Sequence, residues 1–268
     1  MQDTGKFRTN SLDKYYTRES VARECVDIML KHCSQRTWVE PSAGAGSFLI
    51  HRDEINWIAF DIAPDSKNII KQDFLEWQPN INGECAVVGN PPFGRQSSIA
   101  RKFIKKSCEF ANTIGFILPL SFSKPSMQKA FPTKFHLIHQ HKLESNSFII
   151  NKTTTYDVPC VFQIWVKRDR NRELEVAEIP NGFKFVKVTD DWGVSIRRVG
   201  VNAGQSQPRQ DGVLPNTQSH YFVKTETYLD TNKLNAHVFP INTTGPRSLS
   251  KGEITAVVNN LLTEDAST

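Results

Sequence analysis

The sequence lacks any hydrophobic run long enough to cross a membrane. No stretch of about 18 or more apolar residues occurs in the chain, and residues 1–20 are polar, unlike the apolar run of a signal peptide. We therefore expect no membrane span and a cytoplasmic setting, with a nuclear or viral setting left open. The hydrophobic content of 38% is adequate for a sizeable buried core.

Cysteine is sparse and shows no pairing pattern. The chain has five cysteines, none of them in a Cys-x-x-Cys pair. They are Cys25, Cys33, Cys85, Cys108 and Cys160. An odd number of widely spaced cysteines argues against a disulfide framework and against structural zinc. We therefore expect reduced thiols in a reducing compartment and no metal site.

Charge of one sign is in modest excess. The formal net charge is +5 and the pI is about 8.9. Such a balance is compatible with a polyanionic partner, although charge alone is a weak indicator of one.

Short apolar runs alternate with helical patterns in the first two thirds of the chain. The runs lie at 37–40, 56–61, 68–73, 85–89 and 114–119. Most are apolar at their centres, as is typical of strands covered on both faces. Helical spacing predicts helices over 18–32, with Thr17 as N-cap, and over 96–111. Residues 134–143 and 158–168 read as a final strand pair around a loop. This alternation predicts an α/β fold with a doubly wound parallel sheet.

The composition changes near residue 171. Short β-type runs follow, then a stretch at 203–219 rich in Gly, Gln, Ser, Pro and Asn, and a helical pattern at 250–262. We read 171–268 as a small β-rich extension with a long loop at 203–219, 15–170 as the main domain and 1–14 as a polar arm.

A glycine-containing turn follows the first predicted strand in "VEPSAGAGSF", residues 39–48. Gly44 and Gly46 lie where the chain must turn tightly and let a ligand approach its backbone, with Glu40 at the strand end. Asp61 ends the second strand, where a carboxylate can accept hydrogen bonds from two ribose hydroxyls. Asp73 ends the third strand, where it could accept a hydrogen bond from an adenine amino group, with Phe74 beside it as an apolar wall. Three carboxylates would repel a pyrophosphate, so the pattern favours an adenosine ligand.

The loop "NPPF", residues 90–93, follows the fourth predicted strand. The glycine turn, Asp61, Asp73 and this loop follow one another along the chain in an order that resembles that of the class I S-adenosylmethionine-dependent methyltransferases. Within that class, the order and the loop resemble the amino-methyltransferases that modify adenine N6. The segment "KYYTRESVARECVDIM", 14–29, resembles the motif that precedes the cofactor loop in gamma-arranged DNA adenine methyltransferases. The resemblance covers about residues 14–168. Ser47 departs from the glycine of the pattern, and the extension is short for a sequence-specific recognition domain.

The resemblance implies a Rossmann-like sheet, S-adenosyl-L-methionine as cofactor and nucleic acid as substrate, with DNA favoured over RNA. The resemblance leaves open whether an activating partner subunit exists. The cofactor-binding residues that it implies are Tyr16, Thr17, Glu40, Pro41, Ser42, Ala43, Gly44, Gly46, Asp61, Ile62, Asp73, Phe74 and Asn90.

The residues Asn90, Pro91, Pro92 and Phe93 are the predicted catalytic loop. The Asn90 side-chain oxygen and the Pro91 carbonyl can accept the two N–H groups of an exocyclic amine and direct its lone pair. The prolines hold the loop rigid, and Phe93 would stack on the target base. Arg95 is placed to meet a flanking phosphate.

Other substrates also present a planar NH2 group. RNA adenine N6, guanine N2 and protein glutamine amides remain alternatives, as does an idle scaffold that binds nucleic acid. His136, His139 and His141 share one predicted strand but have no nearby Cys or carboxylate set, so we expect no metal there.

Overall fold

The computed structural model describes residues 15–49, 54–150, 154–175, 178–243 and 246–265. The predicted polar arm, 1–14, lies outside these residues. The chain divides into two compact units, one up to Leu174 and one from Glu175 onward.

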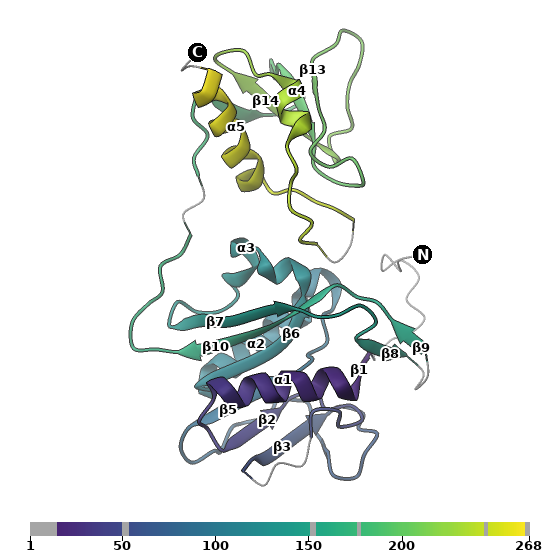
Figure 1. The fold of residues 1–268 in the computed structure, drawn as a ribbon, viewed down its shortest axis with the longest axis vertical. Helices are drawn as coiled ribbons and strands as arrows, with labels where there is room; N and C mark the ends of the chain where they lie inside the picture. Colours follow the sequence, from purple (N-terminus) through teal and green to yellow (C-terminus); the bar gives the residue numbers. More distant parts are fainter. Residues whose placement is uncertain (1–14, 50–53, 151–153, 176–177, 244–245, 266–268) are drawn as a thin grey trace. The chain divides into compact units, whose positions relative to one another are not determined.

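A seven-stranded sheet forms the centre of the first unit (Figure 1). Its order is β4-β3-β2-β5-β6-β10-β7, in which the first five strands are parallel and β10 runs antiparallel to both neighbours. The strands are β2 Thr37–Glu40, β3 Asn56–Asp61, β4 Ile70–Lys71, β5 Cys85–Gly89, β6 Thr113–Pro119, β7 Phe135–Lys142 and β10 Cys160–Lys167. The predicted doubly wound α/β sheet is confirmed, although β4 is shorter than its apolar run.

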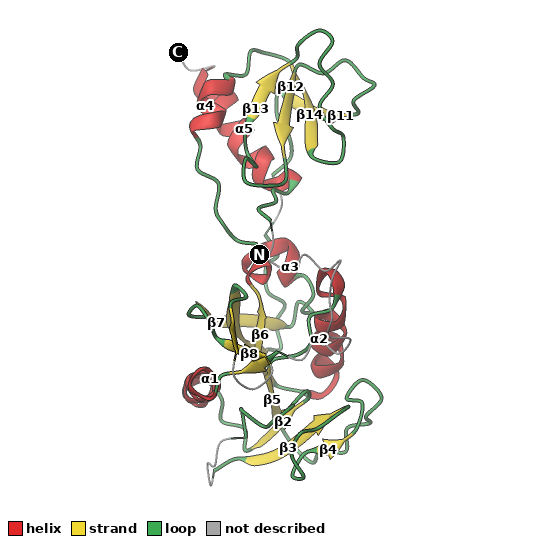
Figure 2. Cartoon of the chain, turned by 90° about the vertical axis from the view of Figure 1, so that its right-hand side faces the viewer, coloured by secondary structure: helices red, strands yellow, loops and turns green. Residues whose placement is uncertain are grey.

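Helices cover both faces of this sheet. Helix α1, Glu19–His32, packs on one face and α2, Ser98–Phe110, on the other (Figure 2). Both faces are therefore apolar, and every residue of β5 and β6 is buried. The prediction of Thr17 as N-cap was wrong: Arg18 occupies that position, because Thr17 is already paired in a strand.

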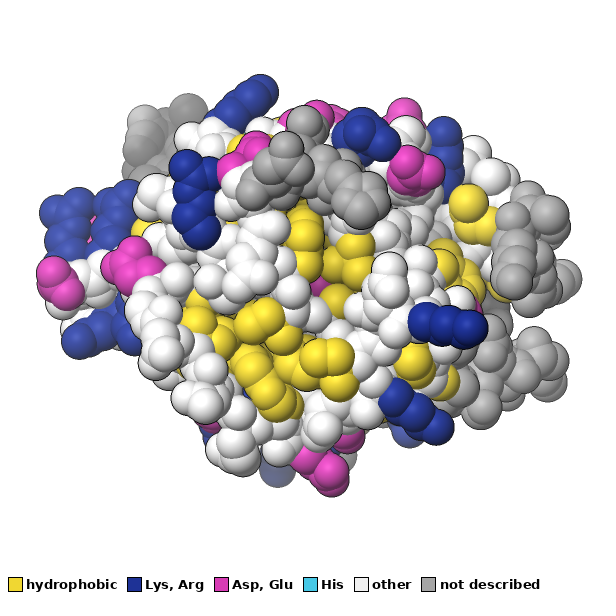
Figure 3. Space-filling model, turned by 90° about the horizontal axis from the view of Figure 1, so that it is seen from below, with side chains coloured by type: hydrophobic (Ala, Val, Ile, Leu, Met, Phe, Trp, Pro, Cys, Tyr) yellow, Lys and Arg dark blue, Asp and Glu magenta, His cyan; other side chains and the backbone are white. Residues whose placement is uncertain are grey.

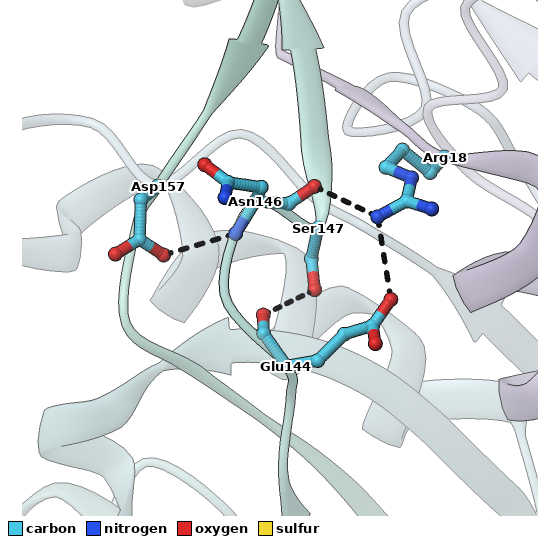
Figure 4. A network of polar contacts seen from close by, with 5 residues as sticks. All are labelled: Arg18, Glu144, Asn146, Ser147 and Asp157. Carbon is cyan, nitrogen blue, oxygen red and sulfur yellow. Dashed lines mark hydrogen bonds and ion pairs between the residues drawn. The ribbon is translucent and has the colours of Figure 1, made fainter.

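That strand is β1, Tyr16–Thr17, which pairs with β8, Phe148–Ile150, and through it with β9, Thr154–Tyr156. The segment between β7 and β10 is therefore a hairpin rather than the loop expected from its polar sequence. Figure 4 shows the polar contacts that connect the residues before β8 to Arg18 and to Asp157. Arg18 donates to the Glu144 carboxylate at 3.3 Å and to the Asn146 carbonyl at 3.4 Å, and the Asn146 N–H donates to Asp157. These contacts fix the chain where it enters α1.

Two short helices follow β6 at the carboxyl edge of the sheet. They are the 3-10 turn η2, Leu120–Ser123, and α3, Pro125–Gln128. A further 3-10 turn, η1, Arg95–Ser97, precedes α2, so that α2 begins two residues later than predicted.

The second unit has its own antiparallel sheet, in the order β11-β14-β12-β13. The strands are β11 Phe183–Val186, β12 Val194–Arg197, β13 Ser206–Pro208 and β14 His220–Thr225, followed by the helices α4 Thr231–Ala236 and α5 Lys251–Asp265. Phe183, Ile196, Val223, Ile254 and Val258 form its separate core. The stretch 203–219 was expected to be a loop, but it contains β13, which pairs with β12.

In the view from below, hydrophobic side chains gather in the middle of the face and charged ones lie mainly around it (Figure 3).

Across the described part of the chain, no helix is both long and apolar enough to span a membrane.

Candidate active site

The predicted site residues meet at the carboxyl edge of the parallel strands. Glu40 ends β2, Asp61 ends β3 and Gly89 ends β5. Parallel strands bring their carboxyl ends to one edge, and the order of strands reverses between β2 and β5. Such a switch point is where doubly wound sheets bind ligands.

Asp61 holds the glycine turn in place. Its Oδ2 accepts from the Gly44 N–H and its Oδ1 from the Ala63 N–H, both at 2.8 Å. Gly44 has φ 54°, in the left-handed region that favours glycine. A Cβ at Gly44 would lie 3.1 Å from Tyr16 Cε1, so the tyrosine ring lies directly on the turn.

Tyr16 also connects the turn to the loop after β3. Its hydroxyl donates to the Asp65 carboxylate, and the Asp65 N–H donates to the Gly44 carbonyl at 3.0 Å. Burial, followed by the hydrogen bond to Asp65, raises the pKa of Tyr16 to about 12. The phenol therefore remains a neutral hydrogen-bond donor at physiological pH.

Glu40 is a buried acid with an unsatisfied oxygen. It is 2% exposed, and its Oε2 has no hydrogen-bond partner among the residues that the structure describes. Loss of solvation, followed by repulsion from Asp61, raises the pKa of Glu40 well above its ordinary value. A Cβ at Gly89 would lie 3.3 Å from Glu40 Cγ, so β5 approaches this side chain closely. The environment favours a cationic group beside Glu40.

The remaining predicted cofactor residues flank this turn. Ile62, next to Asp61, exposes 54% of its surface. Asp73 follows β4 and accepts from the Leu75 N–H at 2.8 Å, which shapes the next turn. The Phe74 side chain is 1% exposed and packs against Phe103 and Trp77, so it is a core residue in this structure. Pro41, Ala43 and Thr17 are buried, whereas Ser42 and Gly46 are partly exposed.

Asn90 connects the predicted catalytic loop, residues 90–93, to its neighbours. Its Nδ2 donates to the Tyr15 carbonyl at 3.4 Å, and its own carbonyl accepts from the Ser42 hydroxyl at 3.1 Å. Its side-chain oxygen Oδ1 is buried and has no partner within the described part of the chain. The amide is therefore oriented with a free acceptor.

The rest of the loop is anchored to α2. The Phe93 carbonyl accepts from the Ile99 and Ala100 N–H groups at 3.2 and 3.3 Å. Pro91 is buried, whereas Pro92 and Phe93 are half-buried, and Phe93 contacts both core clusters of the unit. Arg95, two residues further on, is exposed.

Sequence reasoning missed one aromatic pair at this edge. The rings of Tyr15 and Tyr156 stack with centroids 5.1 Å apart. No local pattern indicates this pair, because it depends on the pairing of β1 with a hairpin far along the chain.

Metal-ligating side chains do not gather at this edge. In the ranges that the structure describes, no group of three or more His, Cys, Asp or Glu side chains could hold a metal ion.

Comparisons with known proteins find similarity in structure alone. No protein-family model matches the chain, and no curated protein matches its sequence. A candidate RNA methyltransferase from Pyrococcus horikoshii is 17% identical, with a TM-score of 0.45, over 58% of this chain and 87% of the other. A candidate class I S-adenosylmethionine-dependent methyltransferase from Listeria monocytogenes is 12% identical, with a TM-score of 0.42, over 62% and 65%. The M protein of the type I restriction enzyme EcoKI is 14% identical, with a TM-score of 0.39, over 58% and 44%.

The fold class is Rossmann-like. This assignment follows from the strand order, with its reversal between β2 and β5 and its antiparallel β10 between β6 and β7. It is the sheet expected of a class I methyltransferase.

Proposed function

We propose that this protein transfers a methyl group from S-adenosyl-L-methionine to the exocyclic N6 amine of adenine in DNA. In this proposal residues 15–170 are the catalytic domain and 171–268 the extension. The observation that carries the proposal is the buried, unpartnered Oδ1 of Asn90, at the same sheet edge as the glycine turn.

The residues at the glycine turn and at the ends of β2 and β3 fit S-adenosyl-L-methionine. The buried oxygen of Glu40 suits the ammonium group of its methionine part, and Gly44 lets a ligand approach the backbone. Asp61 uses both oxygens to hold the turn and keeps lone pairs for ribose hydroxyls. The exposed Ile62 offers an apolar surface for the adenine. When bound, the cofactor supplies an electrophilic methyl group on a sulfonium centre.

The catalytic loop makes the amine nucleophilic by orienting it. Asn90 Oδ1 and the Pro91 carbonyl accept its two N–H groups, so its lone pair turns out of the ring plane toward the methyl group. With a methyl group supplied by the bound cofactor, the oriented amine nitrogen would accept that group and release one proton to solvent. The half-buried Phe93 stacks on the base.

The test is incubation with methyl-labelled cofactor and, separately, duplex DNA, single-stranded DNA, RNA and a protein extract, followed by mass spectrometry of nucleosides and amino acids. The expected product is N6-methyladenine in DNA. Label only in RNA or protein would retain the chemistry and overturn the substrate, and no label would overturn the function.

Two variants separate the proposed role of the loop 90–93 from that of the cofactor-binding residues. We expect Asn90→Ala to abolish transfer while calorimetry shows nearly unchanged cofactor affinity, and Asp61→Ala to weaken cofactor binding first. Asn56→Ala, an exposed position at the opposite edge, is the matched control. A collapse of cofactor affinity in Asn90→Ala would contradict the assignment of Asn90 to the substrate.

A further inference from the structure

Positive charge is concentrated in one span of the chain, which begins at the catalytic loop. Between Asn90 and Leu143 there are nine lysines and arginines and one acid, Glu109, a net charge of +8 in a chain that carries +5. From Glu175 onward, nine basic residues face ten acidic ones. The charge excess therefore belongs to the first unit.

The fold gathers much of this charge on one side of the sheet. Within the span β6 is fully buried, so basic residues lie on α2, around α3 and at the ends of β7. Met127 of α3 packs in the same core cluster as α2, and an Arg101 Nη2 donates to its sulfur at 3.0 Å. Helix α1 lies on the opposite face (Figure 2). Helices α2 and α3 thus present neighbouring cations.

Several of these cations have no acidic partner. Arg95, Arg101, Lys102, Lys105 and Lys129 are exposed, and no described carboxylate lies within ion-pairing distance of any of them. By contrast, Lys106 pairs with Glu109 at 3.7 Å. Like charges three or four residues apart on a helix repel one another, which is unfavourable unless an anion neutralises them.

We propose that this cationic surface, made of Arg95, Arg101, Lys102, Lys105 and Lys129, binds the phosphodiester backbone of the nucleic acid beside the target base. The inference rests on the proposed function and adds where the polyanion lies. Because the Phe93 carbonyl caps the first turn of α2, the surface is fixed relative to the catalytic loop. Phosphate contacts there would set the position of the strand from which the base is extruded.

The experiment compares two double variants with equal net charge. Lys102→Glu with Lys105→Glu alters the surface, whereas Lys31→Glu with Lys184→Glu changes exposed lysines on α1 and β11. Binding is measured by fluorescence anisotropy as a function of salt, with one labelled oligonucleotide sequence prepared as duplex DNA, single-stranded DNA and RNA. These three forms distinguish the sources of the phosphate.

The surface variant should bind on the order of tenfold more weakly, and its salt slope should fall by about 1.8 on duplex or about 1.4 on single strands, as expected for two lost phosphate contacts. The control should bind like the parent protein. Parental affinity and slope in the surface variant, an equal loss in the control, or no binding of any oligonucleotide by the parent would overturn the proposal.

This readout is independent of turnover. S-Adenosylhomocysteine affinity should be unchanged in both double variants, because neither alters the glycine turn. If the surface variant loses nucleic-acid binding while the parent protein transfers no methyl group, the surface stands and the proposed function fails.

Discussion

At the scale of single residues, Glu40 shows why a ligand-free site is costly to fold. Its carboxyl group is 2% exposed and one oxygen lacks a partner in the described chain. The folded state therefore holds its proton more tightly than the unfolded state does. The resulting instability is absent below the ordinary pKa of 4.5 and grows as the pH rises above it.

Glu40→Gln should therefore stabilise the ligand-free protein at neutral pH, because a neutral amide avoids the cost of burying a charge, while weakening cofactor binding through loss of the carboxylate. Urea denaturation from acid to neutral pH measures the first effect, which should vanish near pH 4.5, and calorimetry measures the second. Glu76→Gln, at an exposed position, is the control. Lower stability of Glu40→Gln at neutral pH would mean that the carboxylate is paired in the free protein.

Gly94 is a second residue whose role is local. It has φ 66°, and a Cβ there would lie 2.5 Å from Ile99 Cγ1, in the first turn of α2. Because ψ at Gly94 is 179°, its backbone conformation is almost confined to glycine, and Gly94→Ala should cost about 1–3 kcal/mol for the backbone alone. The contact with Ile99 adds a further cost, which should displace the loop 90–93 and slow the proposed methyl transfer.

Gly83→Ala separates these two costs. Gly83 has φ 90° and nothing within 4 Å of its Cβ position, so it incurs the backbone cost alone. Urea denaturation of both variants gives the difference. Equal losses of stability and unchanged transfer in Gly94→Ala would show that Ile99 yields without moving the loop.

At the scale of elements, the sequence was informative where pattern and local chemistry agree. The apolar runs predicted the strands β2, β3 and β5 because buried parallel strands need apolar side chains on both faces. The start of α2 was predicted two residues too early, because Gln96 and Ser97 adopt left-handed φ values that their residue types do not indicate. The β8–β9 hairpin was missed because β8 pairs with β1, a segment far earlier in the chain. Strand β13 was missed because it is a short, largely polar segment, Ser206–Pro208, that only its pairing with β12 distinguishes from a loop.

One cluster between elements makes stability depend on pH. His139 and His141 of β7 lie 3.0 Å apart between ring nitrogens, with His32, Lys31 and Glu24 of α1 facing them. Burial lowers the pKa of both, and neighbouring positive charge adds to this for His139. The unfolded chain therefore binds protons more readily, and stability should fall as the pH drops below 6.5.

Thermal denaturation between about pH 5 and pH 8 measures this dependence. His139→Gln should flatten the acidic fall, because it removes one of the two protonation sites. His237→Gln, in the second unit, is the matched control. An equally steep fall in His139→Gln would place the proton uptake elsewhere.

At the scale of the whole molecule, the positions of the predicted site residues were easier to anticipate than the contacts that support them. Glu40 and Asp61 are the last residues of strands and Asn90 directly follows one, so their order along the chain was enough to predict that they lie at one edge. The Tyr15 carbonyl that orients Asn90, and the contact of Tyr16 with Asp65, join segments that only the folded chain brings together. Such contacts cannot be predicted from the residues adjacent in the sequence.

The division into two units has a thermodynamic consequence. Each unit has its own core, built on different strands and helices, so each can unfold cooperatively by itself. Calorimetry should therefore resolve two transitions, and S-adenosylhomocysteine at about 100 times its Kd should raise one of them, by about 2.7 kcal/mol of unfolding free energy. Asp61→Ala should abolish that shift without moving the other transition, because Asp61 lies in the first unit alone. A single transition that the ligand raises as a whole would show instead that the two units fold as one.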